Sequence, residues 1–152
     1  MKRAWTLVAA GILASACGKP AGSGPTDIDG HQRLAARKFS VSVPPSWQLK
    51  ELPGTDSYVG EIGGDGITLY FDFGWYSDPL SPANYPGHTR TSETIGGEQA
   101  TIVVPNVVGS GVTGVHFPDL GGKVRLTISG RDLTASQQDT VLAIFRTIRF
   151  TK

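Results

Sequence analysis

Apolar and polar residues alternate along much of this chain, and the alternation restricts it to a strand-rich fold. The pattern is clearest in "ITLYFDF" (67–73) and returns in "KFSVSVP" (38–44) and "KVRLTIS" (123–129). Successive side chains of a β-strand point to opposite faces, so a period of two predicts strands with one buried and one polar face. The residues on the predicted core face of the first segment are Ile67, Leu69, Phe71 and Phe73.

Turn signals separate further strand candidates. "GGDG" (63–66) lies between "SYVGEI" (57–62) and the strand that begins at Ile67, and an Asp-Gly pair between β-rich runs predicts a hairpin. Residues 77–92 contain three prolines and predict a long loop. The remaining strand candidates are "SWQLKEL" (46–52), "GEQATIVV" (97–104) and "GVTGVHF" (111–117).

The spacing of apolar residues changes from that of a strand to that of a helix near the end of the sequence. "TASQ" (134–137) fits a capping box, in which a threonine and a glutamine three residues later satisfy the first free amides of a helix. Apolar residues then recur at helical spacing, and the final "IRF" predicts an extended segment. We therefore predict an α+β fold, with an antiparallel sheet of about six strands and a C-terminal helix packed on one face. The predicted buried helix face holds Val141, Ile144, Phe145 and Ile148.

The first residues have the composition of a secretory signal peptide. Lys2 and Arg3 precede the apolar run "AWTLVAAGILA" (4–14). About 20 apolar residues are needed to cross a bilayer as a helix, whereas a signal peptide needs only about 7–15. Residues 1–16 are therefore predicted to be a cleaved signal peptide.

The single cysteine, Cys17, follows small residues at the end of this run and resembles the lipobox of bacterial lipoproteins. The resemblance implies cleavage before Cys17, a diacylglycerol on its thiol and an acyl chain such as palmitate on its new amino group. Ala14 stands where the family prefers leucine, and Leu13 lies one position earlier. An ordinary signal peptide cut at or just after Ala16 is the alternative.

Lipidation implies a protein attached to the membrane and located in the cell envelope, facing the periplasm or the exterior. The residue after the cysteine is Gly18 rather than aspartate, which favours the outer membrane if the organism has one. Residues 17–30 are rich in Gly, Pro, Ser and Asp and predict a flexible tether. Residues 31–152 are then one globular domain.

Charge excludes one class of partner. Lys2 and Arg3 are lost with the signal peptide, so 14 basic residues minus 2 leaves 12 against 13 acidic residues. No basic run occurs in the sequence, and a nucleic-acid partner is therefore not expected.

Three stretches together resemble the PsbP-like superfamily, which includes DcrB-type envelope lipoproteins. They are "FSVSVPPSWQL", "ITLYFDFGWYS" and "TASQQDTVLAIFRTIRF". The resemblance implies a layered α/β/α sandwich with a binding or assembly role and no family-wide catalytic residues. The chain departs from the pattern because no helix is predicted between residues 44 and 95.

Alternation also predicts a polar face of the sheet. Tyr70 and Asp72 share one face of their strand, while His116 and Arg125 point away from their apolar neighbours. If these strands are adjacent, Asp72, His116 and Arg125 could converge, and Asp72 could orient His116 as a general base, as in a hydrolase. The other interpretation is a solvated face with ordinary cross-strand pairs. No G-x-S-x-G nucleophile motif accompanies the pair.

Metal and cofactor motifs are not found in the sequence. His31, His88 and His116 are scattered without zinc-ligand spacing, and the aspartates lack the rhythm of a calcium loop. We therefore expect neither a metal nor a cofactor.

Trp75, Tyr76 and Tyr85 lie among prolines, where aromatic side chains often anchor a partner. They could equally cap the core beneath the loop. The expected function is that of a non-enzymatic, membrane-anchored lipoprotein that binds an envelope protein. A hydrolase using Asp72 and His116 and a small-ligand-binding lipoprotein are the alternatives.

Overall fold

The computed structural model describes residues 27–151, so the predicted signal peptide, Cys17 and most of the tether lie outside the described residues. The described part contains ten strands and one helix. In chain order these are β1 (Gln32–Ala35), β2 (Phe39–Val43), β3 (Gln48–Leu52), β4 (Ser57–Gly64), β5 (Ile67–Gly74), β6 (His88–Ile95), β7 (Glu98–Pro105), β8 (Val112–Phe117), β9 (Arg125–Arg131), α1 (Ala135–Phe145) and β10 (Arg149–Phe150).

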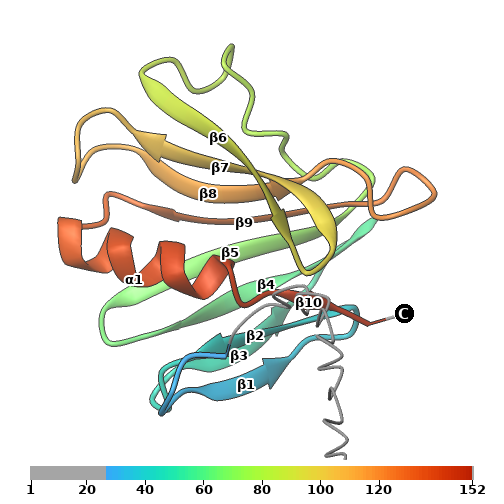
Figure 1. Cartoon of the computed structure of the whole chain (residues 1–152). Coiled ribbons are helices and arrows are strands. Elements are labelled where there is room, and N and C mark those ends of the chain that lie inside the picture. The colour runs from blue at the N-terminus through green and yellow to red at the C-terminus, as the bar shows by residue number, and fades with distance from the viewer. Residues whose placement is uncertain (1–26, 152) are drawn as a thin grey trace, which may run out of the picture.

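The strands form two antiparallel sheets. Seven strands make a large sheet in the order β3-β4-β5-β9-β8-β7-β6, and β1-β2-β10 make a small one. The helix and the small sheet cover the same face of the large sheet (Figure 1). The predicted α+β class and the C-terminal helix on one sheet face are therefore confirmed.

The prediction of about six strands in one sheet is wrong. The additional strands are β1, β6 and β10, and two of them belong to the separate small sheet. β6 is the edge strand of the large sheet, and most of its residues are at least partly exposed, so it lacks the apolar alternation that marks a strand in sequence. The predicted loop is accordingly shorter, because β6 already begins at His88.

The predicted hairpin between β4 and β5 is confirmed. Asp65 and Gly66 both have positive φ angles, 54° and 79°, as a two-residue turn that follows the twist of the strands requires. The Asp65 carboxylate also accepts hydrogen bonds from the Ser46 hydroxyl at 2.6 Å and the Trp47 indole at 3.2 Å. These bonds tie the turn to the start of β3, where Trp47 is buried in the core.

The helix begins as predicted. Thr134 is its N-cap, and the reciprocal hydrogen bonds of Thr134 and Gln137 form the capping box. Val141, Ile144 and Phe145 of the predicted apolar face are buried on the helix, whereas Ile148 is buried beyond its end at Phe145. β10 follows directly and pairs with β2, so the end of the chain is extended as predicted.

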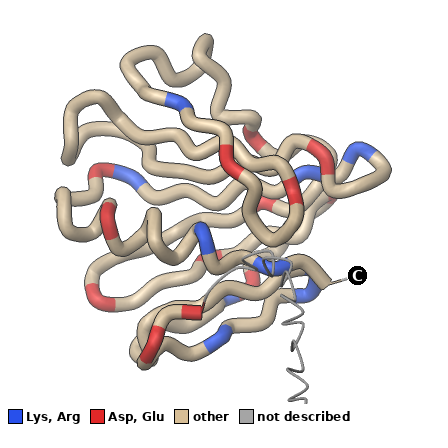
Figure 2. The backbone as a smooth tube through the Cα atoms, viewed as in Figure 1, with Lys and Arg blue, Asp and Glu red and all other residues tan. Residues whose placement is uncertain are grey.

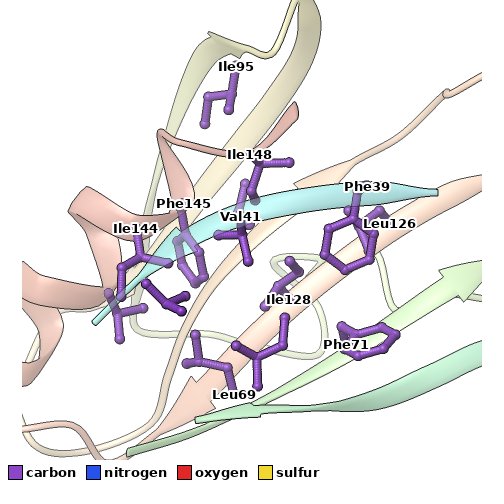
Figure 3. Packing of buried hydrophobic residues seen from close by; sticks show 14 of the residues in the cluster. Phe39, Val41, Leu69, Phe71, Ile95, Leu126, Ile128, Ile144, Phe145 and Ile148 are labelled. Carbon is purple, nitrogen blue, oxygen red and sulfur yellow. The ribbon is translucent and has the colours of Figure 1, made fainter. Parts of the chain in front are cut away.

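One apolar core joins the two sheets and the helix (Figure 3). Phe39 of β2 meets Phe71 of β5 edge to face, with 5.4 Å between ring centroids. Phe71 also lies over Gly60 of β4, where an added Cβ would approach the ring to 2.5 Å. Burial of each such side chain contributes about 1.5–3 kcal/mol. The core occupies one face of the large sheet, and the opposite face carries polar residues and a smaller apolar cluster of Leu80, Val103 and Val112.

Asp27, which belongs to the predicted tether, contacts the folded domain. Its carboxylate pairs with Arg33 of β1, and its Oδ2 lies 3.2 Å from the Arg149 guanidinium. Basic and acidic positions are interspersed over the described chain (Figure 2). Between residues 27 and 151, no helix is long and apolar enough to span a membrane.

Candidate functional site: a cavity on the polar face of the large sheet

The strand register brings the predicted polar residues onto three neighbouring strands. Asp72 of β5 pairs with Thr127 of β9, which pairs with His116 of β8, so the three form one row across the sheet. In the next row, Tyr70 pairs with Ser129. All of these side chains belong to the face opposite the core.

Residues 75–87 connect β5 to β6 and cross this polar face; we name them the covering loop. Leu80 of the loop is buried against Val103 and Val112 of the sheet, with Tyr85 packed alongside. At Gly114 an added Cβ would lie 2.6 Å from Leu80 Cδ1, so the glycine makes room for the leucine.

Arg90 of β6 holds the covering loop from the side. Its guanidinium donates two hydrogen bonds to the Leu80 carbonyl, at 3.1 and 2.9 Å, and one to the Tyr85 carbonyl at 3.1 Å. A further bond reaches the carbonyl of His88. A planar guanidinium can serve several acceptors at once, and here two of them are carbonyls of the covering loop.

Thr127 connects the loop to the sheet. Its hydroxyl donates to the Asp78 carbonyl at 2.6 Å and accepts from the Ser77 hydroxyl at 2.6 Å. His116 Nδ1 lies 2.9 Å from the same oxygen. The single Thr127 proton is directed at Asp78, so His116 Nδ1 is the donor of this third bond.

A cavity of about 590 Å³ lies between the covering loop and the sheet. Part of its wall lies beyond the last registered pair of β5 and β9, Tyr70–Ser129, since β5 begins at Ile67 and β9 continues to Arg131. The wall includes Tyr70, Asp72, Asp78, Leu80, Tyr85, Thr127, Ser129, Arg131, Asp132 and Gln137.

Asp72 is the least satisfied group in this wall. Its Oδ1 is buried and has no hydrogen-bond partner among the described residues. Burial raises the pKa of Asp72, a hydrogen bond with the Ser57 hydroxyl lowers it, and the nearby Asp78 charge raises it. Burial and the Asp72 charge likewise raise the pKa of Tyr70. The site therefore holds a carboxylate whose charge is poorly stabilised.

Asp78, in contrast, is well satisfied. Oδ1 accepts from the Leu80 amide at 2.9 Å, and Oδ2 accepts from the Tyr85 hydroxyl at 2.6 Å. This hydrogen bond is the largest cause of the raised pKa of Tyr85, which the nearby Arg131 partly opposes. Asp78 thus holds the loop in shape.

The structure does not join Asp72 and His116. They lie on either side of β9, and two strand spacings separate their backbones by about 9–10 Å. His116 is only 5 % exposed. Burial lowers its pKa, the Arg125 charge lowers it further, and Asp78 acts in the opposite direction. The imidazole is thus neutral near pH 7 and is oriented by Thr127 rather than by a carboxylate.

The three loop aromatics separate into two environments. Trp75 and Tyr76 are 59 % and 77 % exposed and, with Asp56, line a second hollow of about 400 Å³. Tyr85 is half-buried, with its ring edge-on to His88 at 5.7 Å.

Arg125, the fourth residue of the predicted polar face, lies at the start of β9, opposite Gly74.

Sequence reasoning missed several residues of the site. Thr127 could have been found, because it continues the alternation of its strand on the polar face. Asp78, Leu80 and Arg90 carry no local signal, because their roles depend on how the loop folds back onto the sheet.

Among residues 27–151, no group of three or more His, Cys, Asp or Glu side chains is placed to hold a metal ion. Comparison of the chain with protein-family models, curated proteins and solved structures found no match.

Proposed function

We propose that this protein is a lipid-anchored, non-enzymatic binding protein of the cell envelope whose cavity takes up a small polar ligand. The observation that carries the proposal is the cavity of about 590 Å³ with hydroxyl, carboxylate and aromatic groups converging on it. Ligand pockets of roughly 300–1,000 Å³ with a few placed polar groups are typical of small-molecule sites.

The anchor rests on the sequence. The lipobox resemblance assigns the lipid to Cys17, and the segment before Asp27 is long enough to hold the domain some tens of ångströms from the bilayer, at about 3.3–3.6 Å per residue. Intact mass of the membrane-extracted protein, beside a Cys17→Ser control, tests it. A mature chain that begins at Cys17 and carries diacylglycerol and an acyl chain supports the proposal, and an unlipidated mass contradicts it.

The PsbP-like resemblance belongs to the same proposal. It rests on the order of a strand ending in proline and tryptophan, a hairpin and a C-terminal helix, and it implies a binding or assembly role. The described residues contain one helix, and an α/β/α sandwich would need a second helical layer. The resemblance is therefore supported by the order of the elements alone.

Binding is favoured over hydrolysis by the positions of the candidate groups. General-base catalysis through an aspartate–histidine pair requires a hydrogen bond between them, and His116 is bonded to Thr127 instead. The hydrolase alternative would need a rearrangement that separates His116 from Thr127.

A second candidate function is recognition of an envelope protein through Trp75 and Tyr76. Their exposed rings favour it, because aromatic anchors contribute strongly to protein interfaces. Tyr85 is reassigned from this surface to the cavity wall.

Cavity filling tests the small-ligand proposal. A chemically diverse fragment library is screened by ligand-observed NMR against the full mature protein and a Ser129→Phe variant, which places a ring in the cavity. Ser92→Phe, at an exposed position of β6, is the control. Fragments that bind the wild type and the control but not Ser129→Phe support the proposal; equal binding by all three, or binding by none, contradicts it.

A further inference from the structure

We propose that the ligand of the cavity is an organic ammonium ion, bound by the carboxylate of Asp72 against the ring of Tyr70. This inference rests on the proposed small-ligand function and names its chemical class.

The charges of the wall favour a cation. The cavity is lined by three carboxylates, Asp72, Asp78 and Asp132, and by one guanidinium, Arg131. An excess of one sign in a partly enclosed hollow raises the local concentration of ligands of the other sign.

Two of the carboxylates are already engaged. Asp78 accepts bonds from the Leu80 amide and the Tyr85 hydroxyl, and Asp132 accepts from the Gly111 amide at 2.7 Å. Asp72 forms no ion pair with any described residue, and the charge that acts most on it is the like charge of Asp78. A partly buried carboxylate without a counter-ion is costly, and a bound cation removes that cost.

The groups around Asp72 suit an ammonium in particular. Tyr70 precedes it by two residues on the same face of β5, and its ring is 45 % exposed, so the ring can form a cation–π contact. Ser129, opposite Tyr70 on β9, carries a hydroxyl oxygen and also lines the cavity. An ammonium has three N–H donors, and the two carboxylate oxygens of Asp72 and the Ser129 hydroxyl can accept them.

The experiment compares ligands that differ only in charge. Benzylammonium, ethanolammonium and 1,4-diammoniobutane are titrated by calorimetry into the full mature protein in detergent, each beside the alcohol that replaces its ammonium groups. Benzoate is the anionic control. We expect the ammonium ions to bind and each matched alcohol to bind at least about tenfold more weakly, since one charged hydrogen bond accounts for that factor.

Two variants locate the site. Asp72→Asn keeps the shape of the side chain and should weaken ammonium binding about tenfold or more, while the exposed Asp139→Asn on α1 should leave it unchanged. Tyr70→Leu should weaken ammonium binding about two- to fivefold and leave the alcohols unaffected. Thermal unfolding of each variant verifies that it is folded.

The possible outcomes distinguish failure of the ammonium proposal from failure of the small-ligand proposal. Alcohols or benzoate that bind as tightly as the ammonium ions, with loss in Ser129→Phe, overturn the cation proposal and leave the cavity as a ligand site. Ammonium binding that Asp72→Asn does not weaken also overturns it. Failure of every probe, together with an empty fragment screen, overturns both.

Discussion

The imidazole of His116 is hydrogen-bonded to the hydroxyl of Thr127, with 2.9 Å between Nδ1 and Oγ1. Because Thr127 also binds Ser77 and Asp78, this bond links the buried histidine to the covering loop. The polar face of the sheet is thus a connected network in which the histidine has a structural role, and the uncompensated charge lies at Asp72.

The network predicts a loss of stability in mild acid. The folded pKa of His116 lies below its ordinary value of 6.5, so the unfolded chain binds a proton that the folded chain rejects. The stability is fully present above about pH 6.5 and is lost as the pH falls from there through the lowered folded pKa. Urea unfolding at pH 7.5, 6.5 and 5.5 measures this. The decline should be smaller in His116→Gln, and an equal decline in both proteins would contradict the assignment.

For Asp72 we expect stability to change with pH in the opposite direction. Its folded pKa is raised above 3.8, so ionisation of Asp72 destabilises the fold as the pH rises through that window. Asp72→Asn should therefore increase the free energy of unfolding at pH 7, by about 0.5–1 kcal/mol, because solvent still screens part of the carboxyl. Chemical denaturation measures it, with Asp139→Asn as control; a destabilised Asp72→Asn would contradict this prediction, because the hydrogen bond with the Ser57 hydroxyl would then outweigh the cost of burial.

We expect the stability losses caused by substitutions at Gly114 and Leu80 to depend on each other. Gly114→Ala should cost about 1–3 kcal/mol, because its Cβ would overlap the leucine side chain. Leu80→Ala alone should cost about 2–5 kcal/mol. The double variant should lose less than the sum, because the shortened side chain leaves room for the methyl group. Additive losses would show that the alanine conflicts with the β9 backbone instead.

Arg90 predicts a local effect on the covering loop. Arg90→Lys cannot serve three carbonyls with one planar group, so amide hydrogen exchange should rise in residues 78–87. The loss in stability should be about 1–2 kcal/mol. Arg37→Lys, at an exposed ion pair with Glu51, should leave amide exchange in residues 78–87 unchanged. Unchanged exchange in the loop would indicate that Leu80 alone holds it.

We expect substitution of Trp75 and Tyr76 to affect partner binding but not the stability of the fold. Replacing both with alanine should change stability by less than about 0.5 kcal/mol, as is usual at exposed positions. Trp47→Ala should cost about 3–5 kcal/mol, because that side chain is buried. If the exposed pair contacts a protein, cross-linking to envelope proteins should fall in the double variant. A large loss of stability there would place the two rings in the core.

Much of the fold was predictable because its signals are local. Alternation identified β2, β5 and β9, and the Asp-Gly pair identified the hairpin. The extended segment at β10 was predicted, but not its pairing with β2. β1 and β6 were missed because the first is short and the second is an exposed edge strand. Such strands are held by pairing with neighbours rather than by an apolar face of their own.

The sequence by itself determined which residues share a face, because backbone geometry alternates side chains whatever the partner strand. It therefore placed Tyr70 and Asp72 together and assigned the helix its cap and buried side. Only the tertiary structure decided which strands are adjacent and where the covering loop folds. Strand order put β9 between Asp72 and His116, and a hydrogen bond from Thr127 to the Asp78 carbonyl, 49 residues earlier in the chain, joined the loop to the sheet. Such contacts join residues distant in the chain, and no local pattern encodes them.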